Sequence, residues 1–155
     1  MIRLAAAPLT TLMLALGLVA CGGDDAPTKA EFGAEADKVC AAAEKNLGEI
    51  GQDATSRAEI AKAVDKVIDE TQNSLDDLKA LDRPDGAAGE AADKFVDSLE
   101  SDIQDKGIPA LEKLRDAIKD KDTQAAQQAY QELAAIETTD SDKLAKELGA
   151  NGCAD

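Results

Sequence analysis

Four stretches of the chain place an apolar residue at every third or fourth position, a spacing that turns one face of an α-helix toward a core. The first stretch follows a capping-box sequence at Thr28–Glu31, and the second follows another at Ser56–Glu59. The third runs through Gly107–Pro109, and the fourth begins at Asp122 or Thr123. No run shows the sustained alternation of a strand, so the pattern predicts an all-α protein.

The positions expected to face the core are mainly Ala, Leu, Ile and Val. Burial of such side chains contributes ~1.5–3 kcal/mol for each large residue, and should be the main stabilising term. In the first two helices these positions are Phe32, Ala36, Val39, Cys40, Ala43 and Leu47, then Ile60, Val64, Val67, Ile68, Thr71, Leu75, Leu78 and Leu81. In the last two they are Ala88, Ala92, Phe95, Val96, Leu99, Ile103, Leu111, Leu114 and Ile118, then Ala126, Ala129, Tyr130, Leu133, Ile136, Leu144 and Leu148.

Short links separate the four helices. Gly48 or Gly51 ends the first, and Asp82–Gly86 ends the second because it contains both proline and glycine. Gly107–Pro109 should kink or divide the third helix, since proline lacks a donor and disfavours α geometry at the residue before it. Thr138–Ser141 should break or kink the fourth. We therefore expect an antiparallel up-down four-helix bundle with kinked third and fourth helices.

The start of the chain has the anatomy of a secretory signal, with Arg3 ahead of the apolar run Leu4–Ala20. An uncleaved membrane helix is the weaker alternative, because Pro8 and Gly17 interrupt a run of only about 17 apolar residues. The last residues of this run, Leu18-Val19-Ala20-Cys21, resemble the lipobox of bacterial lipoproteins. In that family the chain is cut before the cysteine, and the thiol is alkylated with diacylglycerol.

The lipobox resemblance implies three segments. Residues 1–20 would be a cleaved signal peptide, residues 21–27 a flexible tether and residues 28–155 the helical domain. Cys21 would carry acyl chains such as palmitate, and each buried methylene contributes ~0.8 kcal/mol to membrane attachment. We therefore expect a lipoprotein on the extracytoplasmic face of the cell membrane, held there by membrane lipid.

The chain contains three cysteines, and lipidation of Cys21 leaves Cys40 and Cys153. An even pair in an exported protein favours a disulfide. That bridge would close a loop of roughly 110 residues and stabilise the fold by up to ~4–5 kcal/mol. The alternative is two reduced, buried thiols.

Composition excludes several functions. The net charge of −15 opposes binding to nucleic acid, and the absence of histidine rules out Ser-His-Asp systems and histidine zinc sites. Neighbouring carboxylates occur at Asp65 and Asp69, at Asp76 and Asp77, and at Asp82 and Asp85. They lack the spacing of a calcium loop, and the chain lacks the aromatic platforms usual in a sugar cleft. We therefore predict no catalytic residues, no metal and no cofactor.

Both ends of the mature chain carry a further resemblance. The segment Phe32-Gly33-Ala34-Glu35-Ala36-Asp37-Lys38-Val39-Cys40-Ala41 resembles the opening of small exported helical proteins common in actinobacteria. The ending Leu148-Gly149-Ala150-Asn151-Gly152-Cys153-Ala154 is similar to theirs as well. The resemblance implies a helical bundle pinned by a Cys40–Cys153 bridge outside the cytoplasmic membrane. It implies no particular activity.

Two functions remain, neither of them enzymatic. The first is a binding or structural role at the cell envelope, in which the links Gly48–Thr55 and Asp120–Asp122 meet another envelope protein. Acidic charge would steer the domain toward a basic partner. The second is carriage of a small apolar ligand inside the bundle. Its expected cavity would be lined by Phe95, Ile108, Leu114 and Tyr130.

Overall fold

The computed structural model describes residues 26–154, and no strand occurs among them. The predicted signal peptide, Leu18 to Ala20 of the lipobox, Cys21 and most of the tether lie outside the described residues. The expected all-α class is confirmed. The helices are α1 (Lys29–Glu49), α2 (Arg57–Ala80), α3 (Ala87–Ser101), the π-helix η1 (Asp102–Gly107), α4 (Ile108–Asp120), α5 (Thr123–Ala134), α6 (Thr139–Leu148) and the short 3₁₀ helix η2 (Asn151–Cys153).

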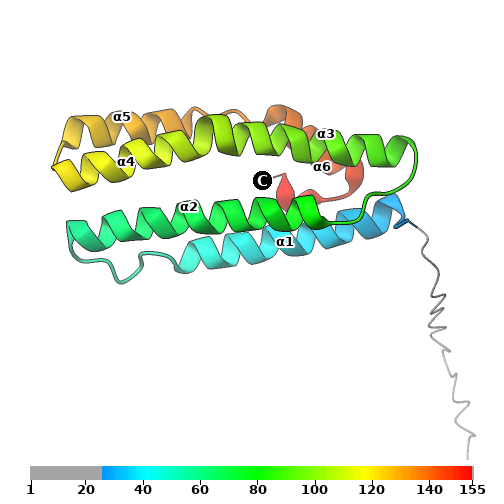
Figure 1. Cartoon of the computed structure of the whole chain (residues 1–155), viewed down its shortest axis with the longest axis horizontal. Helices are drawn as coiled ribbons and strands as arrows, with labels where there is room; N and C mark the ends of the chain where they lie inside the picture. The colour runs from blue at the N-terminus through cyan, green and yellow to red at the C-terminus, as the bar shows by residue number, and fades with distance from the viewer. Residues whose placement is uncertain (1–25, 155) are drawn as a thin grey trace, which may run out of the picture.

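The helices lie lengthwise beside one another (Figure 1). α1 packs on α2, α2 on α4, and α4 on α5, whereas α6 packs on α3 and η2 on α1. The α1–α2 and α4–α5 links lie together at one end of the molecule, which we call the link end (Figure 1). The start of α1 and the α2–α3 link lie at the opposite end, which we call the tether end (Figure 1).

Both predicted capping boxes are confirmed. The backbone N–H of Thr28 donates to the Glu31 carboxylate over 2.8 Å, and the Thr28 hydroxyl accepts from the N–H of Glu31. Ser56 and Glu59 repeat this exchange at the start of α2, again with a 2.8 Å bond to the carboxylate. Because four N–H groups are free at each helix start, these local bonds fix where α1 and α2 begin.

We predict that the Glu59 carboxyl titrates far below its ordinary pKa. Backbone N–H groups of Thr55 and Ser56 donate to it and lower its pKa from 4.5 to about 2. A lowered folded-state pKa stabilises α2 above about pH 4.5, and this contribution is lost as the pH falls through about 2. Carbon-detected NMR titration should show a midpoint near 2 for Glu59 and a higher midpoint in Ser56→Ala/Thr55→Ala. A wild-type midpoint at the ordinary value would contradict the cap.

The third helix is interrupted by a π-helix and not by a break. The chain stays helical from α3 through η1 into α4, although Pro109 is the second residue of α4. At the end of η1 the N–H of Ile108 donates to the carbonyl of Ile103, one residue further back than in an α-helix. The wider turn accommodates a proline that cannot donate. The expected irregularity is therefore present. It spans Asp102–Gly107, so it ends at the first residue of the predicted Gly107–Pro109.

The fourth helix is divided as expected, at residues 135–138. α5 ends at Ala134 and α6 begins at Thr139, so the break lies slightly before the predicted Thr138–Ser141. The division lets α6 pack on α3 while α5 packs on α4.

The core consists of two clusters. The larger lies toward the tether end and includes Phe32, Phe95 and Leu148, each at most 1% exposed. The smaller consists of Val64, Ile68 and Ile108, each 8% exposed. Its partly buried neighbours are Ile103, Leu111, Leu114 and Ile118.

Two predicted core positions are wrong. Tyr130 is 66% exposed and Ile60 is 41% exposed. The physical reason is that α5 packs mainly on α4, through the buried Ala129, so few contacts with the other helices cover Tyr130. Ile60, at the start of α2, borders a hollow lined by residues of α4 and α5. Apolar positions that a closed bundle would bury therefore reach solvent.

Candidate functional site

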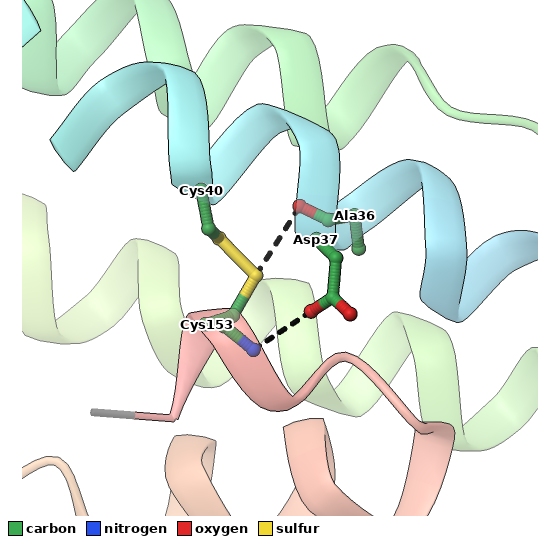
Figure 2. Close-up of a disulfide and its surroundings, with 5 residues drawn as sticks. Ala36, Asp37, Cys40 and Cys153 are labelled. Atoms are coloured by element: carbon green, nitrogen blue, oxygen red, sulfur yellow. Dashed lines mark hydrogen bonds between the residues drawn. A yellow bond between two sulfur atoms is a disulfide. The ribbon is translucent and has the colours of Figure 1, made fainter. Parts of the chain in front are cut away.

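The C-terminal tail is attached to the middle of α1 by a disulfide. Cys40 and Cys153 are bonded, with their Cα atoms 5.3 Å apart and 113 positions apart in sequence. Figure 2 shows η2 lying alongside α1 at this bond. The predicted pairing is confirmed, and the alternative of two reduced thiols is excluded for this structure. Both cysteines are half-buried against the larger cluster.

Polar contacts continue the attachment beside the disulfide. The N–H of Gly152 donates to Asp37 Oδ1 over 2.8 Å, and Cys153 Sγ lies 3.3 Å from the Ala36 carbonyl oxygen (Figure 2). Asp37 stands one helical turn before Cys40, so the carboxylate and the sulfur lie on the same side of α1. The tail is therefore attached to α1 at two neighbouring residues, Asp37 and Cys40.

Gly33 brings the end of α6 close to the start of α1. A Cβ atom at this buried position would overlap the Leu148 carbonyl oxygen and would lie 3.1 Å from the Gly149 carbonyl carbon. Only glycine permits this approach of two backbones. The close contact and the disulfide together position the tail on α1.

Arg83 ties the α2–α3 link to α1, a role that sequence reasoning missed. Its guanidinium lies 5.5 Å from the centre of the Phe32 ring and donates to the carbonyls of Leu78 and Leu81 at the end of α2. Arg83 Nε also pairs with Asp93 on α3 over 3.0 Å. The available signal was a basic residue just beyond a helix end, where carbonyls are unpaired.

A second missed contact joins η1 to α6. Ser141 is 1% exposed, donates to the Thr138 carbonyl over 2.9 Å and lies 3.5 Å from Asp102 Oδ2. Asp102 also pairs with Lys106 over 2.7 Å. A serine, a carboxylate and a lysine are therefore close together, but the hydroxyl is buried. The group fixes α6 against η1 and offers no accessible nucleophile.

The acidic pairs do not form a metal site among the described residues. Asp65 pairs with Arg115 over 3.2 Å and lies 3.8 Å from Lys119 Nζ, while Asp82 and Asp85 stand exposed in the α2–α3 link. Residues 26–154 contain no group of three or more acidic or sulfur ligands that could hold a metal ion. The structure gives these carboxylates roles in ion pairs and on solvated surfaces.

The four residues predicted to line a ligand cavity are not brought together. Phe95 belongs to the larger cluster, whereas Ile108 and Leu114 belong to the smaller one. Tyr130 is largely exposed on α5. The residues expected to line one cavity therefore lie in two separate packed clusters and at one surface position.

The two links predicted to dock a partner each border a hollow at the link end. One hollow, of about 680 Å³, lies beside the α1–α2 link and is lined by residues that include Asn46, Ile50, Asp53 and Lys62. The other, of about 200 Å³, lies beside the α4–α5 link. Its lining is Arg57, Ile60, Ala117, Ile118, Lys121, Asp122, Thr123 and Ala126.

Comparison with protein-family models, curated proteins and solved structures finds no match to this chain. In the part of the chain that the structure describes, no helix has both the length and the apolar character needed to cross a membrane.

Proposed function

We propose that the chain is an exported lipoprotein, anchored through acylated Cys21 to the extracytoplasmic face of the cell membrane. Its role there is binding or structural and not enzymatic. The observation that carries the proposal is the pairing of Cys40 with Cys153, which leaves Cys21 as the one cysteine outside the bridge. That cysteine directly follows the apolar run and the lipobox-like residues. A disulfide is also the usual mark of an oxidising compartment.

The architecture we propose is an antiparallel up-down bundle that is joined to the membrane anchor by the N-terminal tether. Support comes from the alternation of links between the two ends of the molecule (Figure 1). An anchor before Ala26 would place the tether end next to the membrane and the link end away from it. The domain would then present its links to other components of the envelope.

The link end is the surface that we propose for docking a partner. Each of its two links borders a hollow, and the residues that line the two hollows include the charged Asp53 and Asp122. The excess of acidic residues favours encounter with a basic partner.

Replacing Cys21 tests the anchor. We expect Cys21→Ala to release the domain into the medium or to leave an uncleaved precursor, because the thiol to be acylated is gone. Ala26→Ser, in the same tether, should leave attachment unchanged. Fractionation followed by mass measurement distinguishes these forms. A mature-sized Cys21→Ala protein retained in the membrane would refute the lipid anchor.

Charge reversal tests the docking surface. The test variant is Asp53→Lys, in the α1–α2 link at the link end. The control is Asp85→Lys, which makes the same change on an exposed residue of the α2–α3 link at the tether end. We expect affinity capture from native envelopes to recover a basic partner with wild-type protein and Asp85→Lys, but not with Asp53→Lys. If no captured protein is lost in Asp53→Lys, docking at the link end is contradicted.

The alternative function, carriage of a small apolar ligand, has weaker support. Its four expected contact residues are divided between clusters and surface, as described above. Organic-solvent extracts of the purified protein should contain no apolar molecule in stoichiometric amount, since the acyl chains proposed for Cys21 would stay covalently attached to the protein.

A further inference from the structure

The outer face of α5 carries no charge, in a chain of which 32% of residues are charged. The one charged residue between Thr123 and Ala134 is Glu132, and its carboxylate pairs with Lys113 of α4 over 2.7 Å. Interface cores are depleted of charged residues and enriched in tyrosine. The remaining exposed side chains of the helix after Thr123 are Gln124, Gln127, Gln128, Tyr130, Gln131 and Ala134.

The packing of α5 directs these side chains away from the rest of the molecule. Ala129, 2% exposed, lies at the contact with α4. At 100° per residue, Gln127 and Gln131 stand on the opposite side of the helix, with Tyr130 beside them. Tyr130 is one of two large hydrophobic side chains exposed in the described residues. Two neutral amides therefore form the centre of this face, and the aromatic ring lies next to them.

We propose that the outer face of α5 binds a second copy of this chain, with the two α5 helices packed about a twofold axis parallel to them. A twofold contact presents the same patch from both copies, so each group must be able to pair with its own kind. Glutamine amides and the tyrosine hydroxyl both donate and accept hydrogen bonds, and satisfy this requirement. Ionised carboxylates only accept hydrogen bonds and repel one another, so they cannot pair with their own kind across such an axis.

Charge favours this face over the others for self-association. The chain has a net charge of −15, so two copies repel one another over most approaches. The outer faces of α2 and α3 carry exposed carboxylates, among them Asp69 and Asp77 on α2 and Asp93 and Asp97 on α3. Contact through α5 avoids placing such groups opposite one another.

The geometry of the molecule permits the pairing. α5 runs along the long axis of the molecule (Figure 1), so a twofold axis parallel to it leaves both tether ends on the same side. Beside α5, Ile60 of α2, Ile118 of α4 and Ala126 of α5 line a hollow that the neighbouring helices leave open. A second copy at α5 would cover part of this incompletely buried region.

Sedimentation analysis of the mature protein in detergent tests the proposal. We expect a dimer of the wild-type chain at about 100 µM, and a dissociation constant at least ~10-fold higher in Gln127→Glu/Gln131→Glu, because four carboxylates would meet at the axis. Asn73→Asp/Gln104→Glu is the matched control. It adds the same charge at exposed positions on other helices and should change the constant by less than about twofold.

Wild-type protein that is monomeric at this concentration would overturn the proposal, as would equal weakening by both pairs of substitutions. Circular dichroism should show unchanged helix content in every variant. The result is independent of the lipid anchor, because intact mass reports acylation separately. Loss of acylation would refute the anchor and leave the dimer standing.

Discussion

Removing the bridge in Cys40→Ser/Cys153→Ser should lower the free energy of unfolding by about 4–5 kcal/mol. The two residues are 113 positions apart, so the bond restricts nearly the whole domain in its unfolded state. Whole-domain stabilities are commonly ~5–15 kcal/mol, so a loss of this size removes a large share of the total. Denaturant titration followed by far-ultraviolet circular dichroism measures the change.

Reduction of the wild-type protein provides the control for this double variant. A reducing agent should destabilise wild-type protein to the level of the double variant and should leave the variant itself unchanged. The Asp37 contact to Gly152, the close approach at Gly33 and the burial of Ala150 and Ala154 would then hold the tail without a covalent bond. A loss below about 1 kcal/mol would show that the tail contacts, and not the covalent loop, fix the structure.

Gly33→Ala should cost about 1–3 kcal/mol of stability, because its Cβ would overlap the Leu148 carbonyl oxygen. The neighbour is backbone, so α1 and the end of α6 would have to separate. Thermal or denaturant unfolding measures the loss. The shift should be accompanied by faster amide exchange at Gly152, whose N–H is bonded to Asp37.

Gly48→Ala is the matched control on the same helix. Nothing lies within 4 Å of a Cβ built at Gly48, so alanine should stabilise α1 by about 0.5–1 kcal/mol through its higher helix propensity. The same glycine-to-alanine change should therefore lower the free energy of unfolding at Gly33 and raise it at Gly48. Gly33→Ala as stable as Gly48→Ala would contradict the close contact between the two backbones.

Local sequence signals predicted the beginnings of the helices well. Thr28 and Ser56 bond groups only three residues away, so their effect does not depend on the rest of the fold. Cys40 and Cys153 were paired from the cysteine count and export, although their contact is long-range. Few alternative partners existed, which made that inference possible.

Features that depend on neighbouring helices were not predictable in the same way. Tyr130 falls on the correct apolar stripe, but its burial requires a helix on the open side next to α5. The π-helix before Pro109 depends on how the chain redistributes its hydrogen bonds. The roles of Arg83 and Ser141 depend on Phe32 and Asp102, which lie far away in sequence.

The measurement that tests the central claim most directly is the intact mass of protein purified from native membranes. The account predicts a chain that begins at Cys21, carries diacylglycerol on that cysteine and lacks the two hydrogens removed by one disulfide. Partial proteolysis should recover the lipid on the N-terminal fragment. A chain that begins at Met1, or a Cys21 terminus without acyl groups, would contradict the account.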